Sequence, residues 1–246
     1  MDVSHHIVEA RGLCHDYPDG RSALRDVSFR IHHGEAVAII GANGAGKSTL
    51  LLHLNGVLKP SAGDVRIGDF PIIPGNLAAV RRTVGLVFQD SDDQLFMPSV
   101  FEDVAYGLRN MGLPQAEIES QVARALDAIN AAHLADRPPY RLSAGEKRAV
   151  AIAGVLALSP SILVMDEPSN GLDPATRRRI ITLLQGFDHT KIIATHDLDL
   201  ALDVADRILV MHDGRIEADD APETIFADSK LLARCNLEPP LSMQRR

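Results

Sequence analysis

The hydrophobic and polar positions of this chain form short apolar runs separated by longer amphipathic segments. Runs rich in Val, Ile and Leu lie at residues 35–40, 84–88, 161–165, 191–195 and 207–212. Such runs predict strands buried on both faces of a parallel sheet. Residues 3–33 instead alternate polar and apolar side chains around a turn at residues 17–20, which predicts an antiparallel hairpin or small sheet. A further strand and turn are expected at residues 63–69.

Residues 99–135 follow a helical period. Their apolar side chains recur on one helix face, formed by Ile118, Val122, Ala125, Leu126 and Ile129. Pro114 begins this helix, and two prolines at 138–139 end the region. We interpret the face as core packing rather than a groove for a partner. With further helices expected from near Lys47 to residue 55, at 147–158 and at 177–187, the pattern predicts an α/β fold with a helical insert, followed by a weakly patterned tail.

A glycine-rich stretch, GANGAGKST at residues 41–49, follows the first buried strand. It fits the pattern G-x-x-x-x-G-K-[ST], whose backbone N–H groups cradle nucleotide phosphates. Gly44 and Gly46 lack a Cβ, so the loop can bring these groups close to a triphosphate. Lys47 is expected to reach the β- and γ-phosphates, and the Ser48 hydroxyl to bind Mg²⁺. The order of strand, loop and helix distinguishes this stretch from an ordinary glycine-rich turn and predicts a nucleotide site.

Polar side chains stand at the ends of three other predicted strands. Asp166 and Glu167 come directly after residues 161–165, where ligands bind in parallel sheets. The first carboxylate is expected to hold the Mg²⁺ shell and the second to polarise an attacking water. Gln89 and His196 each end another of these runs, although a glutamine at a strand end is by itself usually a surface residue.

Composition places the chain among ordinary globular proteins. Its 246 residues are 46% hydrophobic and 24% charged, which predicts one α/β domain over residues 1–246. The net charge of -8 argues against a general nucleic-acid-binding surface, so no nucleic acid is expected as a partner. Cys14 and Cys235 lack metal-ligand spacing and are expected to be free thiols in a reducing compartment. The N-terminus has no signal-peptide segment, and the longest apolar run, 149–158, is too short to span a bilayer. Any membrane role is therefore expected to come through a partner.

Taken together, these motifs resemble the ATP-binding cassette (ABC) ATPases through almost the whole chain. Their order is Tyr17, GANGAGKST, Gln89, LSAGE, ILVMDEP, SNGLDP and His196. The resemblance implies a P-loop NTPase (RecA-like) core at about residues 1–89 and 160–225, which includes an N-terminal antiparallel β subdomain. It also implies a helical ABC subdomain at about 90–160 and a C-terminal tail at about 226–246. ATP and Mg²⁺ are the implied cofactors.

The resemblance assigns a role to each matched residue. Tyr17 looks like the aromatic that stacks on adenine, rather than an aromatic half buried in a turn. Ser48, Gln89 and Asp166 resemble the Mg²⁺ shell. The implied catalytic residues are the general base Glu167, the switch histidine His196 on the γ-phosphate, and Lys47. The implied phosphate ligands are Gly41, Ala42, Asn43, Gly44, Ala45, Gly46, Lys47, Ser48 and Thr49.

In this family two subunits pair head to tail, which implies a homodimer. Ser143 and Gly145 would close over the ATP of the opposite subunit, and Asp173 would lie in a loop that crosses the interface. The motif departs from the usual LSGGQ at Ala144, which is compatible if its φ stays negative, and at Glu146, whose carboxylate would repel a γ-phosphate. Taken alone, the pentapeptide also fits a plain helix start with a capping box. The expected compensation for the charge comes from Lys147 and Arg148.

Longer stretches narrow the branch of the family. Residues 53–65, 84–108 and 142–160 look like the ATPase subunits of energy-coupling-factor importers, most of all the cobalt and nickel type. This branch has a second glutamine shortly after the first, and Gln94 fits. The segment after Gln89 docks the membrane partner in importers, so Asp92 and Asp93 are expected to face basic residues of a transmembrane coupling protein. A substrate-binding membrane subunit is the other implied partner, and the implied location is peripheral, on the cytoplasmic face of the cell membrane.

Three alternatives are weaker. Another importer branch would share the same motifs. A non-transport ABC ATPase of DNA repair would carry long heptads between residues 46 and 142, and one of translation would carry two cassettes; this chain has neither. A nucleotide-binding regulator would typically lack Glu167. The transported substrate, whether cobalt, nickel or a vitamin, rests on resemblance alone.

Overall fold

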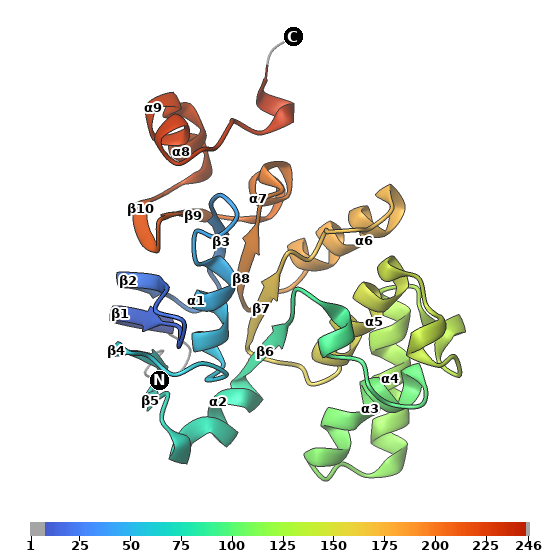
Figure 1. Ribbon diagram of the computed structural model, residues 1–246. Helices are drawn as coiled ribbons and strands as arrows, with labels where there is room; N and C mark the ends of the chain where they lie inside the picture. Colours follow the sequence, from blue (N-terminus) through green and yellow to red (C-terminus); the bar gives the residue numbers. More distant parts are fainter. Residues whose placement is uncertain (1–7, 245–246) are drawn as a thin grey trace.

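The strands form two sheets in the computed structural model, which describes residues 8–244 (Figure 1). The smaller sheet is antiparallel with the order β2-β1-β4-β5. Its strands are β1 (Val8–Asp16), β2 (Ser22–Ile31), β4 (Ala62–Ile67) and β5 (Phe70–Pro71). The antiparallel arrangement predicted for residues 3–33 is confirmed within the described part, and residues 3–7 lie outside it.

The larger sheet has the order β10-β9-β3-β8-β7-β6 and is parallel except for the edge pair β9–β10. Its strands are β3 (Ala36–Ile40), β6 (Val84–Val87), β7 (Ile162–Asp166), β8 (Thr190–Thr195), β9 (Arg207–His212) and β10 (Arg215–Asp220). The apolar runs predicted as parallel strands are therefore confirmed. The order places β3, β8 and β7 side by side, so their carboxyl ends share one edge.

Helix α1 (Lys47–Leu54) joins the two sheets. Leu50, Leu51 and Leu54 are fully or almost fully buried in one core with side chains from both sheets. α1 begins directly after the glycine-rich loop, so this packing fixes the start of the helix beside the ends of β7 and β8. The short α2 (Leu77–Thr83) precedes β6.

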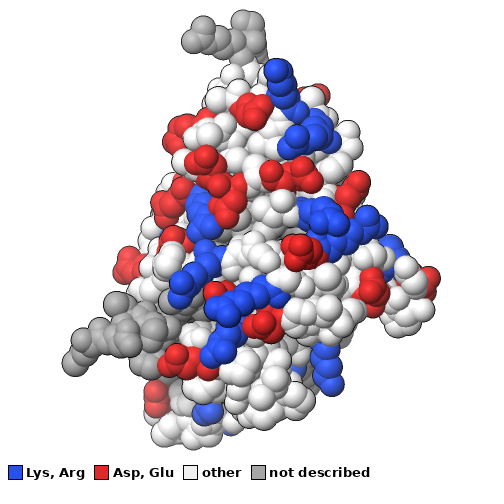
Figure 2. All heavy atoms as spheres, turned by 90° about the vertical axis from the view of Figure 1, so that its left-hand side faces the viewer, with Lys and Arg blue, Asp and Glu red and all other residues white. Residues whose placement is uncertain are grey.

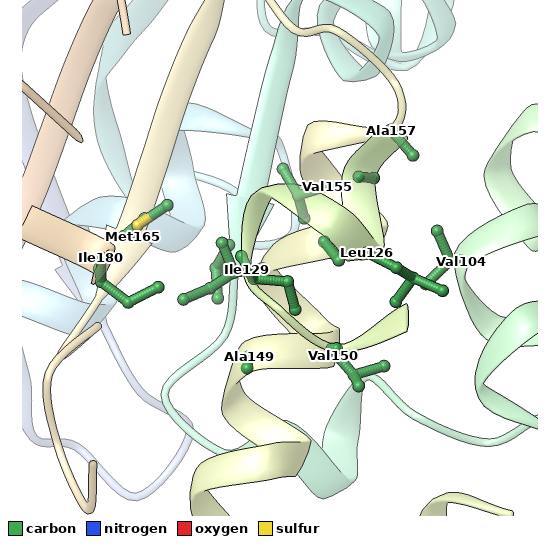
Figure 3. Close-up of a cluster of buried hydrophobic side chains, with 14 of the residues drawn as sticks. Val104, Leu126, Ile129, Ala149, Val150, Val155, Ala157, Met165 and Ile180 are labelled. Atoms are coloured by element: carbon green, nitrogen blue, oxygen red, sulfur yellow. The ribbon is translucent and has the colours of Figure 1, made fainter. Parts of the chain in front are cut away.

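A helical layer made of α3 (Val100–Asn110), α4 (Gln115–Ala128) and α5 (Ala144–Leu156) lies beyond β6, away from the smaller sheet (Figure 1). The predicted apolar face of α4 is buried, which confirms core packing. Figure 3 shows Ile129 between the helical layer and the pair Met165 and Ile180 of the sheet side. Residues 99–135 form separate helices rather than one, because Gly112 takes a φ of 76° between α3 and α4.

Two helices begin earlier than the apolar pattern predicted. α5 begins at Ala144 rather than 147, and α6 (Pro174–Gln185) begins at Pro174 rather than 177. Ser143 and Asp173 cap them by accepting backbone N–H groups of the first turn, so each helix extends three residues toward its N-terminus. α7 (Leu198–Val204) starts in the same way from Asp197.

The weakly patterned stretch after residue 226 is folded against the sheet. α8 (Pro222–Ala227) and α9 (Ser229–Arg234) bury Phe226, Leu232 and Cys235 on the strands β3 and β9. Farther on, the Asp199 carboxylate on α7 accepts hydrogen bonds from the backbone N–H groups of Leu241 and Ser242. Within residues 8–244, no helix is long and apolar enough to cross a membrane.

Charges of both signs are interspersed over the side of β1, β2 and β10, the face turned to the viewer in Figure 2. Arg207 illustrates the pairing, because its guanidinium contacts Glu35 at 3.2 Å and Asp219 at 2.5 Å. Interspersed charges of opposite sign are typical of a solvated surface.

Candidate nucleotide-binding and hydrolysis site

The glycine-rich loop at residues 41–46 follows β3 and is shaped by its glycines. Gly44 and Gly46 have φ values of 81° and 104°, which disfavour any residue with a Cβ. A Cβ on Gly41 would lie 2.3 Å from the Met211 carbonyl oxygen, so the close approach of β9 also requires glycine there. The loop thus takes the conformation that exposes its N–H groups ahead of α1.

Lys47 begins α1 and bends back over this loop. Its ammonium donates hydrogen bonds to the carbonyl oxygens of Gly41 at 2.7 Å and Ala42 at 3.2 Å. Burial lowers the pKa of Lys47, and the charges of Glu167 and Asp166 partly oppose this effect. A buried ammonium between a phosphate loop and two acids is placed to neutralise anionic oxygens.

Asp166 ends β7 with a buried carboxylate facing Ser48. A hydrogen bond from the Ser48 side chain lowers the pKa of Asp166, but burial, the larger effect, raises it above the ordinary value. Asp166 Oδ1 is buried and has no hydrogen-bond partner. An unsatisfied carboxylate oxygen beside a hydroxyl fits the oxygen-donor chemistry of Mg²⁺. Asp166, Ser48 and Gln89 line one cavity of about 670 Å³, so the predicted metal ligands lie together.

Glu167 is held in place by the residues that end β8. It has a φ of 50°, and its backbone N–H donates to the Ala194 carbonyl at 2.8 Å. Its Oε2 accepts hydrogen bonds at 3.2 Å from both the Thr195 hydroxyl and the His196 backbone N–H. The His196 ring nitrogen Nδ1 lies 2.8 Å from the same oxygen. The positive φ is a strained position for a glutamate, which is typical of a functional site.

Glu167 also lines a second cavity of about 380 Å³, together with most of the predicted phosphate ligands and Tyr17. Tyr17 donates to or accepts from the Thr49 hydroxyl at 3.0 Å, so the aromatic ring stands next to α1. The sequence interpretation missed Arg21, which lines this cavity and stacks its guanidinium 4.8 Å from the centre of the Tyr17 ring. In the sequence, only its position four residues after Tyr17 could have indicated that Arg21 lies near the Tyr17 ring.

Gln89 lies at the end of β6 and lines both cavities. Its backbone is tied to α5: the buried Arg148 donates to the carbonyl oxygens of Phe88 and Gln89. Gln94 adds a second connection, because its amide accepts from Phe88 N–H at 3.3 Å and donates to the Ala151 carbonyl at 2.7 Å. Burial lowers the pKa of Arg148, which nevertheless sits near acidic groups of the site.

The LSAGE motif forms the first turn of α5 as a capping box. The Ser143 hydroxyl accepts from Glu146 N–H at 3.3 Å, and Glu146 Oε2 accepts from the Ser143 backbone N–H at 2.8 Å. Ala144 lies in this right-handed turn, so its Cβ fits. A Cβ on Gly145 would lie at an ordinary contact distance of 3.6 Å from the Gly171 carbonyl oxygen.

The prediction that Lys147 and Arg148 compensate the negative charge of Glu146 is wrong. Lys147 pairs instead with Asp92 at 2.5 Å, and Arg148 points to the backbone after β6. Lys147 and Arg148 point away from Glu146 because consecutive side chains of a helix point to different sides. Hydrogen bonds from Ser143 are the main cause that lowers the pKa of Glu146, and Arg137, 4.0 Å away, adds a smaller contribution.

The three residues that the resemblance implies for the opposite subunit do not line the phosphate-loop cavity. Among the residues that the structure describes, Ser143, Gly145 and Asp173 are absent from its lining. Asp173 caps α6 by accepting from Ala175 and Thr176 N–H at 2.9 and 3.1 Å. Their neighbours Ala144, Asn170 and Gly171 line the other cavity, the one with Ser48, Gln89 and Asp166, so both segments border the site within one chain.

A phosphate-binding loop beside an acid pair, at the shared edge of parallel strands, defines a P-loop nucleoside triphosphatase. A family model described as ABC transporter matches residues 24–170. The chain belongs to the ABC transporter family, as an ATPase that couples ATP hydrolysis to transport.

The comparisons with individual proteins extend over nearly the whole chain. It is 63% identical to a putative ABC transporter ATP-binding protein of Geobacter sulfurreducens, covering 98% of this chain and 97% of the relative. It is 46% identical to the energy-coupling factor transporter ATP-binding protein EcfA of Methanocaldococcus jannaschii, covering 96% and 86%. Among solved structures, CbiO1 of Clostridium perfringens, part of a cbiONQ transporter complex, has a TM-score of 0.79 at 40% identity over 94% and 95%. The cassette MJ0796, a dimer with ADP and Pi, has a TM-score of 0.81 at 29% identity over 87% and 98%.

Proposed function

We propose that this chain is the ATP-hydrolysing subunit of an energy-coupling-factor importer for cobalt or nickel. Hydrolysis is supported mainly by the pair Asp166 and Glu167. Asp166 has an unsatisfied buried oxygen, and Glu167 accepts two hydrogen bonds from residues 195–196 and lies 2.8 Å from the His196 ring nitrogen Nδ1. The energy-coupling branch is supported by the 46% identity to EcfA, and the metal substrate by the likeness to CbiO1 and by the stretches quoted above. The identity of the transported substrate is a separate part of this proposal and has its own test below.

In this mechanism ATP lies with its base against Tyr17 and its phosphates on the loop at residues 41–49. Lys47 neutralises charge on the phosphates, and His196 contacts the γ-phosphate. Ser48, Gln89 and Asp166 would hold Mg²⁺, which supplies further positive charge when bound. Glu167 orients the water that attacks in line and accepts its proton.

The proposed working unit is a head-to-tail homodimer. Ser143, Gly145 and Asp173 do not line the phosphate-loop cavity of their own chain, which is compatible with groups that serve the opposite subunit. MJ0796 is a dimer in its solved structure, which supports the same arrangement here. The dimer would bind a transmembrane coupling protein and a substrate-binding membrane subunit at the cytoplasmic face of the membrane.

We propose that the segment after Gln89 is the edge of the chain that docks the membrane partner. Its acids are Asp90, Asp92 and Asp93, and the Asp92 side chain stays exposed despite its ion pair with Lys147. The nearby Phe96 is 63% exposed and stacks edge to face on Tyr106 at 5.0 Å between ring centres. An exposed aromatic pair beside acids suits a basic, amphipathic helix of the membrane partner.

The test is Mg²⁺-dependent ATP hydrolysis by the purified chain across a protein concentration series, with Glu167→Gln alongside. Turnover should rise more than linearly with protein, because two chains build each site. Glu167→Gln should lose turnover while it still binds ATP and accumulates as the closed dimer. Wild-type turnover by this variant would rule out Glu167 as the base. Uptake of radioactive Co²⁺ and Ni²⁺ by cells carrying the whole importer, with and without this chain, tests the substrate.

A further inference from the structure

The carboxylate of Asp197 joins three segments next to His196. Oδ1 accepts from the Arg177 guanidinium at 3.0 Å and from Leu200 N–H at 2.9 Å. Oδ2 accepts from Arg177 Nε at 2.9 Å and from the Ser169 hydroxyl at 3.1 Å. Both oxygens are therefore used, and Arg177 binds in the two-pronged geometry that fixes direction as well as distance.

The same residue is connected to Glu167 through its backbone. Asp197 N–H donates to the Thr195 hydroxyl at 3.0 Å, and that hydroxyl donates to Glu167 Oε2 at 3.2 Å. His196 lies between these two residues and contacts the same carboxylate oxygen. The position of residues 195–197 therefore determines where the Glu167 carboxylate points.

Helix capping alone does not explain this arrangement. The cap of α7 needs one acceptor for Leu200 N–H, whereas Arg177 reaches Asp197 from α6. α6 begins directly after residues 169–173, and Ser169 of that loop meets the same carboxylate. A shift of the loop or of the start of α6 would therefore move Asp197, and with it His196 and Glu167.

We propose that Arg177 is a positioning residue that holds the catalytic pair Glu167 and His196 in register with the loop at residues 169–173. The inference rests on the proposed roles of these residues in hydrolysis. When the opposite subunit contacts the loop, the Arg177–Asp197 pair transmits its position to the residues that orient water and contact the γ-phosphate. ATP binding itself involves the loop at 41–49 and does not depend on this pair.

The experiment compares kcat, KM for ATP, the Kd of a fluorescent ATP analogue and the melting temperature. Arg177→Met should lower kcat by about tenfold to hundredfold, since small misplacements of catalytic groups have effects of this size, with Kd within about twofold. Arg177→Lys should recover part of the loss, because lysine keeps the charge without the fork. Arg178→Met is the matched control, since Arg178 is an exposed arginine on the same helix, and it should behave as wild type.

Asp197→Asn provides the second variant, because asparagine can still cap α7 but cannot form the ion pair. It should lose as much kcat as Arg177→Met, and the double variant should fall no further than either single one. Wild-type kcat in Arg177→Met, an equal loss of ATP binding, or multiplied losses in the double variant would each overturn the inference. Glu167→Gln in the same assay separates the two proposals: if that variant turns over normally, the proposed mechanism fails rather than the role of Arg177.

Discussion

Replacing Glu146 by glutamine should have opposite effects on folding and on the ATP-bound dimer. In the structure, Glu146 Oε2 accepts from Ser143 N–H at 2.8 Å and from the Ser143 hydroxyl at 2.9 Å. A glutamine carbonyl can accept the same bonds, so Glu146→Gln keeps the cap and loses only the charge at the start of α5. That charge is worth about 0.3–1 kcal/mol to a helix.

The pH dependence of this contribution follows from its sign. The folded pKa of Glu146 is lowered, so its stabilisation is present above the unfolded pKa and is lost as pH falls through the folded pKa. The difference in stability between wild type and Glu146→Gln should therefore be present at neutral pH and vanish on acidification. At neutral pH the carboxylate is charged and repels a phosphate.

The geometry of the capping box allows an estimate of the repulsion between the Glu146 carboxylate and a γ-phosphate. If the Ser143 hydroxyl contacts a γ-phosphate oxygen at about 2.7 Å, that oxygen lies roughly 5 Å from the Glu146 carboxylate. Coulomb's law then gives about 0.8 kcal/mol in water and about 3 kcal/mol at an effective dielectric constant of about 20. Because a third of the Glu146 side chain is exposed to solvent, which screens its charge, the lower value of about 0.8 kcal/mol applies to the repulsion. Dimerisation should therefore need about fourfold less ATP in Glu146→Gln.

The assay measures ATP-dependent dimerisation by analytical ultracentrifugation in a Glu167→Gln background, with thermal melting alongside. Glu117→Gln is the matched control, since Glu117 occupies the equivalent first-turn position of α4 and accepts from Gln121 at 3.1 Å. It should leave dimerisation unchanged. If Glu146→Gln dimerised at the same or higher ATP concentration than its parent, the carboxylate would not face the phosphate and the estimate above would be refuted.

Two further predictions concern the metal site and the docking edge. Burial raises the pKa of Asp166, so its ionised form costs stability at neutral pH; that cost shrinks as pH falls through the folded pKa and is gone below the unfolded pKa. Asp166→Asn should therefore raise the melting temperature of the ligand-free chain by a few degrees and abolish the extra stabilisation that Mg²⁺ gives with ATP; a lower melting temperature or a retained Mg²⁺ effect would contradict it. Replacing Asp92 and Asp93 together by alanine should reduce co-purification with the membrane partner, and unchanged recovery would show that these acids do not dock it.

The sequence was sufficient for the parts of the site that are local in the chain. The phosphate loop, the strand before it and the acids after β7 are contiguous motifs whose residue types dictate their conformation. The capping box was also readable, because Ser143 and Glu146 are three residues apart. The same two residues also match the signature motif, and they form the capping box in the structure.

The parts that could not be predicted are contacts between distant segments. Lys147 is 55 residues from Asp92 and Arg177 is 20 residues from Asp197, and no local pattern indicates either pair. Residues after 226 were also underestimated, because short helices of six residues show little periodicity. Their burial depends on the outer surface of β3 and β9, which is defined only by the folded sheet.

The hydrogen bonds that connect Phe88 and Gln89 to α5 involve the main chain of these two residues. Arg148 and Gln94 grip backbone atoms of residues 88 and 89, and the Gln89 side chain takes no part in these bonds. The helical layer therefore contacts this segment through its main chain, whereas the Gln89 side chain remains available to line both cavities. If Gln89 binds Mg²⁺ and its segment docks the membrane partner, as proposed, a change at position 89 should alter hydrolysis. A change at position 148 or 94 should instead alter the coupling to the partner.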